Sequence, residues 1–170
     1  ISSHIMFVSR LSSRASRPVV ARLMSEAAAP SGNLVINFNL PHSTIYDSKE
    51  VSSVIIPGLA GEYGVTAGHS AIVSQMKAGV LQILHADGGD AEKYFVPGGF
   101  ALSHENSVTD ITCPEAVPLD DLDVASITSA FAEAKKSYDS AEDGSEAKAE
   151  AQIDMEVNRA MAAALGTTIA

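Results

Sequence analysis

The chain of 170 residues has little of several residue types on which particular folds and functions depend. A single cysteine, Cys113, excludes an intramolecular disulfide framework and is typical of a protein from a reducing compartment. Tryptophan is absent and aromatic residues make up only 5%, so the core must be built mainly from Val, Ile, Leu and Ala. Because no run of 18 apolar residues occurs, we expect no membrane-spanning helix.

The sequence also lacks the motifs of common catalytic, nucleotide and metal sites. It has neither a Gly-x-Ser-x-Gly elbow nor a Gly-Lys-Ser/Thr phosphate loop. His42, His69, His85 and His104 do not have the i, i+4 spacing of a helical metal site. Gly98-Gly99 is not followed by a helical pattern whose N-terminus would hold a phosphate. We therefore expect no catalytic residue, no cofactor and no bound metal.

Residues 1–25 differ from the remainder in charge, with four arginines, many serines and no acidic residue. This composition, without the central apolar block of a secretory signal, predicts a mitochondrial transit peptide. A basic tail is the alternative interpretation. Residues 26–33, which are rich in Ala and contain Pro30 and Gly32, read as a linker.

The rest of the chain is scarce in positive charge. Residues 26–118 have three lysines against ten acidic residues, and residues 119–170 have four basic against eleven acidic residues, a charge of −7 for each block. Such a surface repels nucleic acid, which is bound through phosphate neutralisation. A large partner is therefore expected to be a protein with basic patches.

Residues 34–116 have the pattern of short strands. Residues 34–40 alternate, with Leu34, Ile36, Phe38 and Leu40 on one face. Further strands are expected near 52–57, 71–73, 80–84, 93–96, 100–102 and 107–113, with turns at 77–79 and 85–90 and a break at 97–99. About ten short strands at this spacing indicate an antiparallel sandwich or barrel, of which we predict the sandwich.

Residues 117–166 instead have two helical patterns. Apolar side chains recur at helical spacing in each pattern, and the break near Gly144 predicts an antiparallel hairpin. We place Asp120 and Asp121 at the helix start, where carboxylates favour the helix dipole. The two stripes are Ile127, Ala130, Phe131, Ala134 and Tyr138, then Ile153, Val157, Ala160, Met161, Ala164 and Leu165. The fold class is therefore α+β, with a hairpin too rich in alanine to be stable without support.

The segment from Gly61 to His69 is the most informative part of the chain. Gly61, Gly64 and Gly68 occur within it, and Gly79 follows ten residues after the histidine. Glycines at this density allow sharp turns and close approach by another backbone. No adjacent residue forms a nucleophile–base pair, so the segment reads as a contact loop.

Six fragments in register resemble the delta/epsilon family of F-type ATP synthase central-stalk subunits, called delta in mitochondria and epsilon in bacteria and chloroplasts. The resemblance covers about Leu34 to Leu165. Ala67 and Pro97 depart from the family pattern, which has proline and serine there. The fragments are Pro57 with Gly61-Glu62-Tyr63-Gly64-Val65, Gly68-His69-Ser70-Ala71, Lys77-Ala78-Gly79-Val80, Tyr94 to Phe100, Val108-Thr109 and Glu115-Ala116.

The resemblance implies a rotor part with no catalytic centre of its own. In the family, the sandwich binds the foot of the gamma subunit and sits on the c-ring, which proton flow turns. Its interface maps onto Gly61, Glu62, Tyr63, Gly64, Gly68 and His69. Glu62 would face ring loops, or else be a solvated turn residue, and His69 would contact a partner or orient the loop. The implied location is the matrix side of the mitochondrial inner membrane, peripheral to the bilayer.

Two alternatives remain open from the residues alone. Some bacterial relatives have a hairpin that binds ATP or extends to inhibit hydrolysis, through arginines in both helices. Here Ser126 and Ala163 stand where two of those arginines would be, although Arg159-Ala160 is kept. This favours a mitochondrial subunit whose hairpin packs against a neighbour such as the small epsilon subunit. The remote alternative is an unrelated ligand-binding sandwich, or a metal enzyme using His69 and His104.

Overall fold

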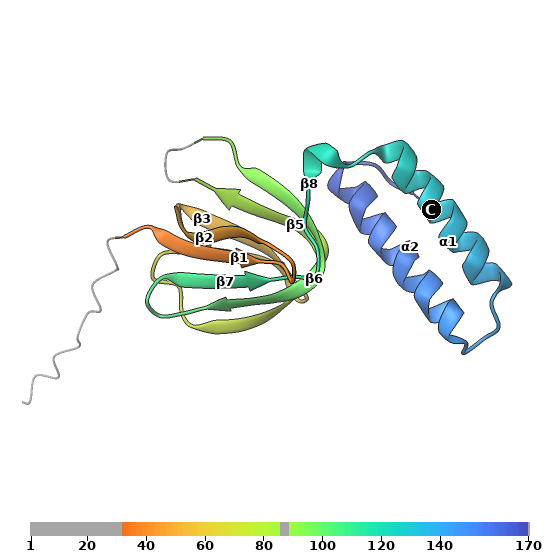
Figure 1. Cartoon of the computed structure of the whole chain (residues 1–170), viewed down its shortest axis with the longest axis horizontal. Coiled ribbons are helices and arrows are strands. Elements are labelled where there is room, and N and C mark those ends of the chain that lie inside the picture. The colour runs from red at the N-terminus through yellow and green to blue at the C-terminus, as the bar shows by residue number, and fades with distance from the viewer. Residues whose placement is uncertain (1–31, 86–88, 170) are drawn as a thin grey trace, which may run out of the picture.

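A computed structural model describes residues 32–85 and 89–169. A β-sandwich and a helical hairpin lie next to each other, joined by a short connector (Figure 1). The predicted α+β class, a sandwich followed by two helices, is therefore confirmed. The predicted transit peptide at 1–25 and most of the predicted linker lie outside the described residues.

The described part of the chain contains eight strands in one hydrogen-bonded sheet. The order is β2-β1-β7-β6-β5-β3-β4, with β8 paired to β6. Every pair is antiparallel except β1 with β7, which can run parallel because the chain between them acts as a long crossover. The strands are β1 (Leu34–Asn39), β2 (Thr44–Val51), β3 (Ser53–Gly58), β4 (Gly61–Thr66), β5 (Ile72–Leu84), β6 (Glu92–Ser103), β7 (Val108–Thr112) and β8 (Val117–Pro118).

The described chain has eight strands where about ten were predicted, and two of the predicted interruptions lie inside continuous strands. The turn predicted at 77–79 is wrong, since Lys77 pairs with Gly98 and Gly79 with Val96 in the β5–β6 ladder. The break predicted at 97–99 is wrong for the same reason. Gly99 has a φ of +144°, and a Cβ there would lie 2.3 Å from the carbonyl oxygen of Thr112. The glycine permits a close crossing of strands where the ribbon curves, so it does not end the strand.

Strands β2 and β4 were not predicted from the sequence. Most of β2 is polar and exposed, so it has no apolar alternation to detect. Strand β4 is hidden in the glycine-rich segment. Both strands lie at the ends of the described sheet path, where only one side of the strand is hydrogen-bonded. Edge strands bury fewer side chains, and this weakens their sequence signal.

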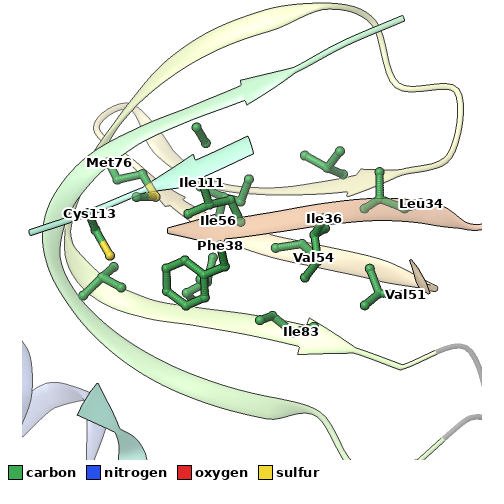
Figure 2. Packing of buried hydrophobic residues seen from close by; sticks show 14 residues of the cluster. Leu34, Ile36, Phe38, Val51, Val54, Ile56, Met76, Ile83, Ile111 and Cys113 are labelled. Carbon is green, nitrogen blue, oxygen red and sulfur yellow. The ribbon is translucent and has the colours of Figure 1, made fainter. Parts of the chain in front are cut away.

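The sandwich core consists almost entirely of aliphatic side chains. Leu34, Ile36 and Phe38 of β1 are buried, which confirms the predicted alternation of that strand. Side chains from β1, β3, β5 and β7 point toward one another between the layers (Figure 2). The cluster comprises Leu34, Ile36, Phe38, Val51, Val54, Ile56, Val65, Met76, Leu81, Ile83, Val96, Ala101, Ile111 and Cys113. Burial of each large member contributes about 1.5–3 kcal/mol, which makes the core the main source of stability.

The hairpin consists of α1 (Val124–Ser140) and α2 (Glu146–Ala164), preceded by the 3-10 helix η1 (Leu119–Asp121). Asp123 caps α1 and Ser145 caps α2, each by accepting backbone N–H groups of the first turn. Asp120 and Asp121 were predicted at the helix start, but they lie in η1, because the chain turns once more before α1 begins.

The two predicted apolar stripes differ in how well they are buried. Ile127, Phe131 and Ala134 of α1 are buried, as expected. In α2 the buried residues are Ala151 and Ala162, whereas Ile153 is 60% exposed. The sandwich contacts only the C-terminal part of α2, and the start of that helix extends beyond it (Figure 1). The second stripe is therefore only partly covered within this chain.

Candidate interaction surfaces

The segment Gly61–His69 is a strand followed by a turn. Residues 61–66 form β4, antiparallel to β3, with Ile56 opposite Tyr63 and Pro57 opposite Glu62. Only residues 67–69 form a turn, closed by a hydrogen bond of 3.2 Å from the His69 N–H to the Thr66 carbonyl. The prediction of one continuous loop was therefore wrong. Alternation along a strand, absent in a loop, now decides where each side chain points.

This alternation separates the six predicted interface residues. Tyr63 packs against the core, whereas Glu62 and Gly64 are exposed on the opposite side of β4. The His69 ring lies 6.4 Å from the Tyr63 ring, centroid to centroid. Gly68 is held by a hydrogen bond of 2.9 Å from its N–H to Ser107 Oγ. Tyr63 and His69 are thus close to each other, and the structure places Glu62 on a different surface.

The first surface is apolar and exposed, and we call it the apolar face, defined by Leu59, Val73 and Phe100. These side chains are 64%, 71% and 53% exposed. They gather around Gln75 of β5, because the Leu59 N–H bonds to the Gln75 carbonyl, Phe100 of β6 pairs with Gln75, and Val73 lies two residues before it. A shallow groove between the β3–β4 turn and the start of β5 contains Leu59, Val73, Gly61 and Tyr63. A large exposed apolar surface marks a contact site more often than a scattered single residue does.

The sequence pattern did not indicate that Leu59, Val73 or Phe100 would lie on the surface. Each lies in or beside a run of apolar residues, where burial is the ordinary expectation. Only the ladder pairing shows that Val73 and Phe100 point away from the core. Sequence spacing gave no signal of this, because the two residues are 27 positions apart along the chain.

The second surface is a groove between the sandwich and the C-terminal end of α2, and we call it the hairpin groove. It contains the charged side chains of Glu62, Lys77 and Lys93. On the other side it is lined by Ala160, Ala163 and Ala164 of α2. Small alanine side chains allow the helix to approach β5 closely while burying little area. Glu62 is therefore positioned beside the hairpin.

Two polar networks fix the edges of the sandwich. The Tyr46 hydroxyl donates to Glu92, and this hydrogen bond, with further contacts from His85 at 2.9 Å and Tyr94 at 3.2 Å, lowers the pKa of Glu92. Burial is the main cause that raises the pKa of Tyr46. The network joins β2 to the start of β6 at the end of the sandwich.

The second network joins β1 and β7 to the turn that follows β6. Asn37 donates to Asp110 at 2.6 Å and lowers the pKa of that carboxyl, assisted by His104 at 2.8 Å. The buried thiol of Cys113 has its pKa raised by burial to about 11, which makes it a packing residue. These groups rigidify the sheet on which both surfaces are built.

No group of three potential metal ligands from His, Cys, Asp and Glu is found among residues 32–85 and 89–169. Neither helix of the described chain is both long and apolar enough to cross a membrane. In the hairpin, the guanidinium of Arg159 lies 5.1 Å from the centroid of the Phe131 ring. This cation–π contact joins the two helices.

A β-sandwich with an exposed apolar face and a helical hairpin docked beside it has the features of a protein that contacts other proteins through its surface. The chain belongs to the delta/epsilon family of ATP synthase subunits. The family model of the β-sandwich domain of the ATP synthase Delta/Epsilon chain matches residues 34–118.

Similar proteins extend this match to the hairpin. The mitochondrial ATP synthase subunit delta' of Ipomoea batatas is 43% identical over 148 residues, which cover 85% of this chain and 72% of the relative. The mitochondrial subunit delta of Saccharomyces cerevisiae is 39% identical over 88% of this chain and 91% of its own length. A chain in the Euglena gracilis mitochondrial ATP synthase structure, which contains OSCP, F1 and the c-ring, superimposes with a TM-score of 0.72 at 28% identity. That match covers 79% of this chain and 82% of the other.

Proposed function

We propose that this protein is a central-stalk subunit of a mitochondrial ATP synthase that links the gamma subunit to the c-ring and couples proton flow to ATP synthesis. The observation that carries the proposal is the exposed apolar face on a sandwich whose residues 34–118 match the family model. A contact that transmits torque needs many modest interactions held by a rigid element. The subunit itself contributes no catalytic centre and binds no cofactor.

The two surfaces suit different partners. The apolar face, with Tyr63 and His69 at its border, suits the gamma subunit, because apolar area without charge favours a permanent contact. Glu62 and Gly64 on the other side of β4 suit polar or basic loops of the c-ring. Gly61 and Gly68 set the turns at the two ends of this strand. The uncovered start of α2, with exposed Ile153, suits the small epsilon subunit.

The proposed location is the matrix side of the inner mitochondrial membrane. The relatives named as mitochondrial support the organelle. The side of the membrane follows from the proposed contact with the c-ring, on which the protein would rest without entering the bilayer.

The direct test is affinity purification of the tagged chain from mitochondria. We expect the gamma, alpha, beta and c-subunits to copurify, and recovery of a free monomer would refute the proposal. The double variant Val73→Asp/Phe100→Asp should lose the gamma subunit, because two carboxylates would be desolvated in the contact. Ile153→Asp is the matched control, which places a charge at another exposed apolar site and should retain gamma. Loss of gamma in both variants would contradict the assignment of the apolar face.

Glu62→Lys tests the proposed ring contact separately. Reversal of this charge should weaken retention of the c-ring and reduce coupling of proton flow to synthesis, while gamma still copurifies. Intact coupling in the variant would show that Glu62 does not face the ring.

A regulatory hairpin that responds to ATP is the alternative function. Ser126, which stands at one arginine position of the bacterial pattern, donates to Asp123 at 2.7 Å within the α1 cap. Arg159 is engaged with Phe131. Both contacts favour the structural role. Addition of ATP to the isolated protein should leave the melting of the helices unchanged, whereas stabilisation would favour the regulatory subunit.

A further inference from the structure

The C-terminal end of α2, which lies in the hairpin groove, has a partial negative charge that no side chain of the helix neutralises. The C-terminal end of a helix carries partial negative charge, which a basic residue in the last turn usually offsets. Helix α2 has no basic residue in its last turn. Its last carbonyls are satisfied by the backbone, since Gly166 donates to Ala163 at 3.0 Å and Thr167 to Ala162 at 2.8 Å. These hydrogen bonds leave the dipole itself without a counter-charge from the helix.

Two basic residues of the sandwich lie in the groove beside this end of α2. Lys77 of β5 and Lys93 of β6 line the same groove as Ala163 and Ala164 of the last helical turn. Lys93 also lines an adjoining depression with Asp120 of η1, so it lies at the open end of the hairpin, where the chain enters α1 and leaves α2. The block that contains the sandwich has only three lysines, and two of them lie in this groove.

The apolar contribution to docking is small in comparison. The helix presents Ala160, Ala163 and Ala164 to the groove, and each methyl group buries little area. α2 contacts β5 and β6 through this region, whereas the start of the helix lies away from the sandwich (Figure 1). With side chains this small on the helix, the charges that line the groove contribute to docking beside the apolar contact.

We propose that Lys77 and Lys93 form an electrostatic latch that holds the C-terminal end of α2 against the sandwich. Docking of the hairpin then weakens as salt screens these charges. Glu62 lies in the same groove with the opposite sign, and its carboxylate opposes the latch by repelling the negative helix end. The latch acts within the isolated chain, so it can be tested independently of the proposed role of the protein in the ATP synthase.

The test measures docking in the full chain by the distance between two spin labels. Asn106→Cys in the turn before β7 and Glu142→Cys between the helices provide exposed sites on the two parts, while Cys113 is buried. The double variant Lys77→Glu/Lys93→Glu should raise the ratio of undocked to docked hairpin on the order of tenfold at low salt. Wild-type protein at 1 M NaCl should change in the same direction, and Glu62→Gln should reduce the undocked fraction.

Lys49→Glu/Lys136→Glu is the matched control, because it changes the net charge equally at exposed positions outside the groove. The latch predicts no undocking in this variant. Equal undocking in both double variants would overturn the proposal in favour of general charge repulsion. An unchanged distance distribution in Lys77→Glu/Lys93→Glu, with the sheet intact by circular dichroism, would also overturn it.

Discussion

The sandwich and the hairpin differ in the size of the buried core that stabilises each of them. The sandwich buries fourteen residues in one cluster that is dominated by Ile, Val, Leu and Phe. The hairpin buries Ile127 and Phe131 in α1, and otherwise only alanines. Two helices with so small a core are marginal alone. The sandwich is therefore a self-sufficient platform, and the hairpin depends on the sandwich and on whatever covers its remaining apolar side chains.

The largest expected effect tests the sandwich. Phe38 is fully buried and its ring meets Tyr94 edge to face, with 5.7 Å between the centroids. Phe38→Ala should lower the free energy of unfolding by about 3–5 kcal/mol, because the cavity cannot collapse between the two rigid layers of the sandwich. Urea unfolding followed by fluorescence and circular dichroism measures this. If the strands stayed folded while only the helices melted, the core would not be the main source of stability.

The corresponding Phe→Ala substitution in the hairpin should cause a smaller loss of stability, confined to the two helices. Phe131→Ala removes the largest buried side chain of α1 and its contact with Arg159. We expect a loss of about 2 kcal/mol from the hairpin alone, since thin helices can move together to fill part of the space. Hydrogen exchange should rise in α1 and α2 and not in β1 or β7. Arg159→Gln is the control, which should reproduce only about 0.5–1 kcal/mol of that loss.

Helix capping offers a change that leaves both cores intact. Ser145 accepts a hydrogen bond from the Lys148 N–H at 3.2 Å and begins α2. Ser145→Ala should destabilise the hairpin by about 1 kcal/mol. Ser140→Ala, at the other end of the connecting turn, removes a hydroxyl that bonds only to a carbonyl within α1, and should have almost no effect. Thermal melting of the helical signal compares the two variants.

The smallest expected effect is the pH dependence of the sandwich. The pKa of Glu92 is lowered, first by the hydrogen bond from Tyr46, so the carboxylate stabilises the fold above its unfolded pKa of about 4.5. This contribution should be lost as pH falls through the lower pKa of the folded state. Glu92→Gln and Tyr46→Phe should each flatten the decline of the urea midpoint between pH 5 and about pH 3. An unchanged slope in both variants would show that other carboxyls, such as Asp110, dominate.

Strands and helices were predicted correctly from the sequence where their buried residues recur at a regular spacing. Period-two alternation located β1, and period-3.6 spacing located α1, because each pattern reports a buried face directly. Prediction from the sequence failed at glycines, because a glycine can either form a tight turn or allow close packing within a strand. Gly79 and Gly99 were read as turns, yet they lie in long strands, since a missing Cβ serves close packing as well as tight turns.

The candidate site was predicted only in part for a related reason. The glycine-rich segment was identified, but its division into two surfaces depends on β4 being a strand, which its composition concealed. The exposure of Val73 and Phe100 depends on pairing between distant segments. The identity of an apolar residue does not show whether its side chain is buried in the core or exposed to a partner protein.

The sequence by itself determined the order of sandwich and hairpin, the acidic surface, the scarcity of aromatic residues in the core and the family resemblance. These properties depend on composition and on spacing within single segments. The tertiary structure decided that Glu62 and Tyr63 face different ways, that an apolar face remains uncovered, and that Lys77 and Lys93 line one groove with the end of α2. Each of these requires contacts between segments far apart in the chain, and such contacts exist only after the strands have paired and the hairpin has docked.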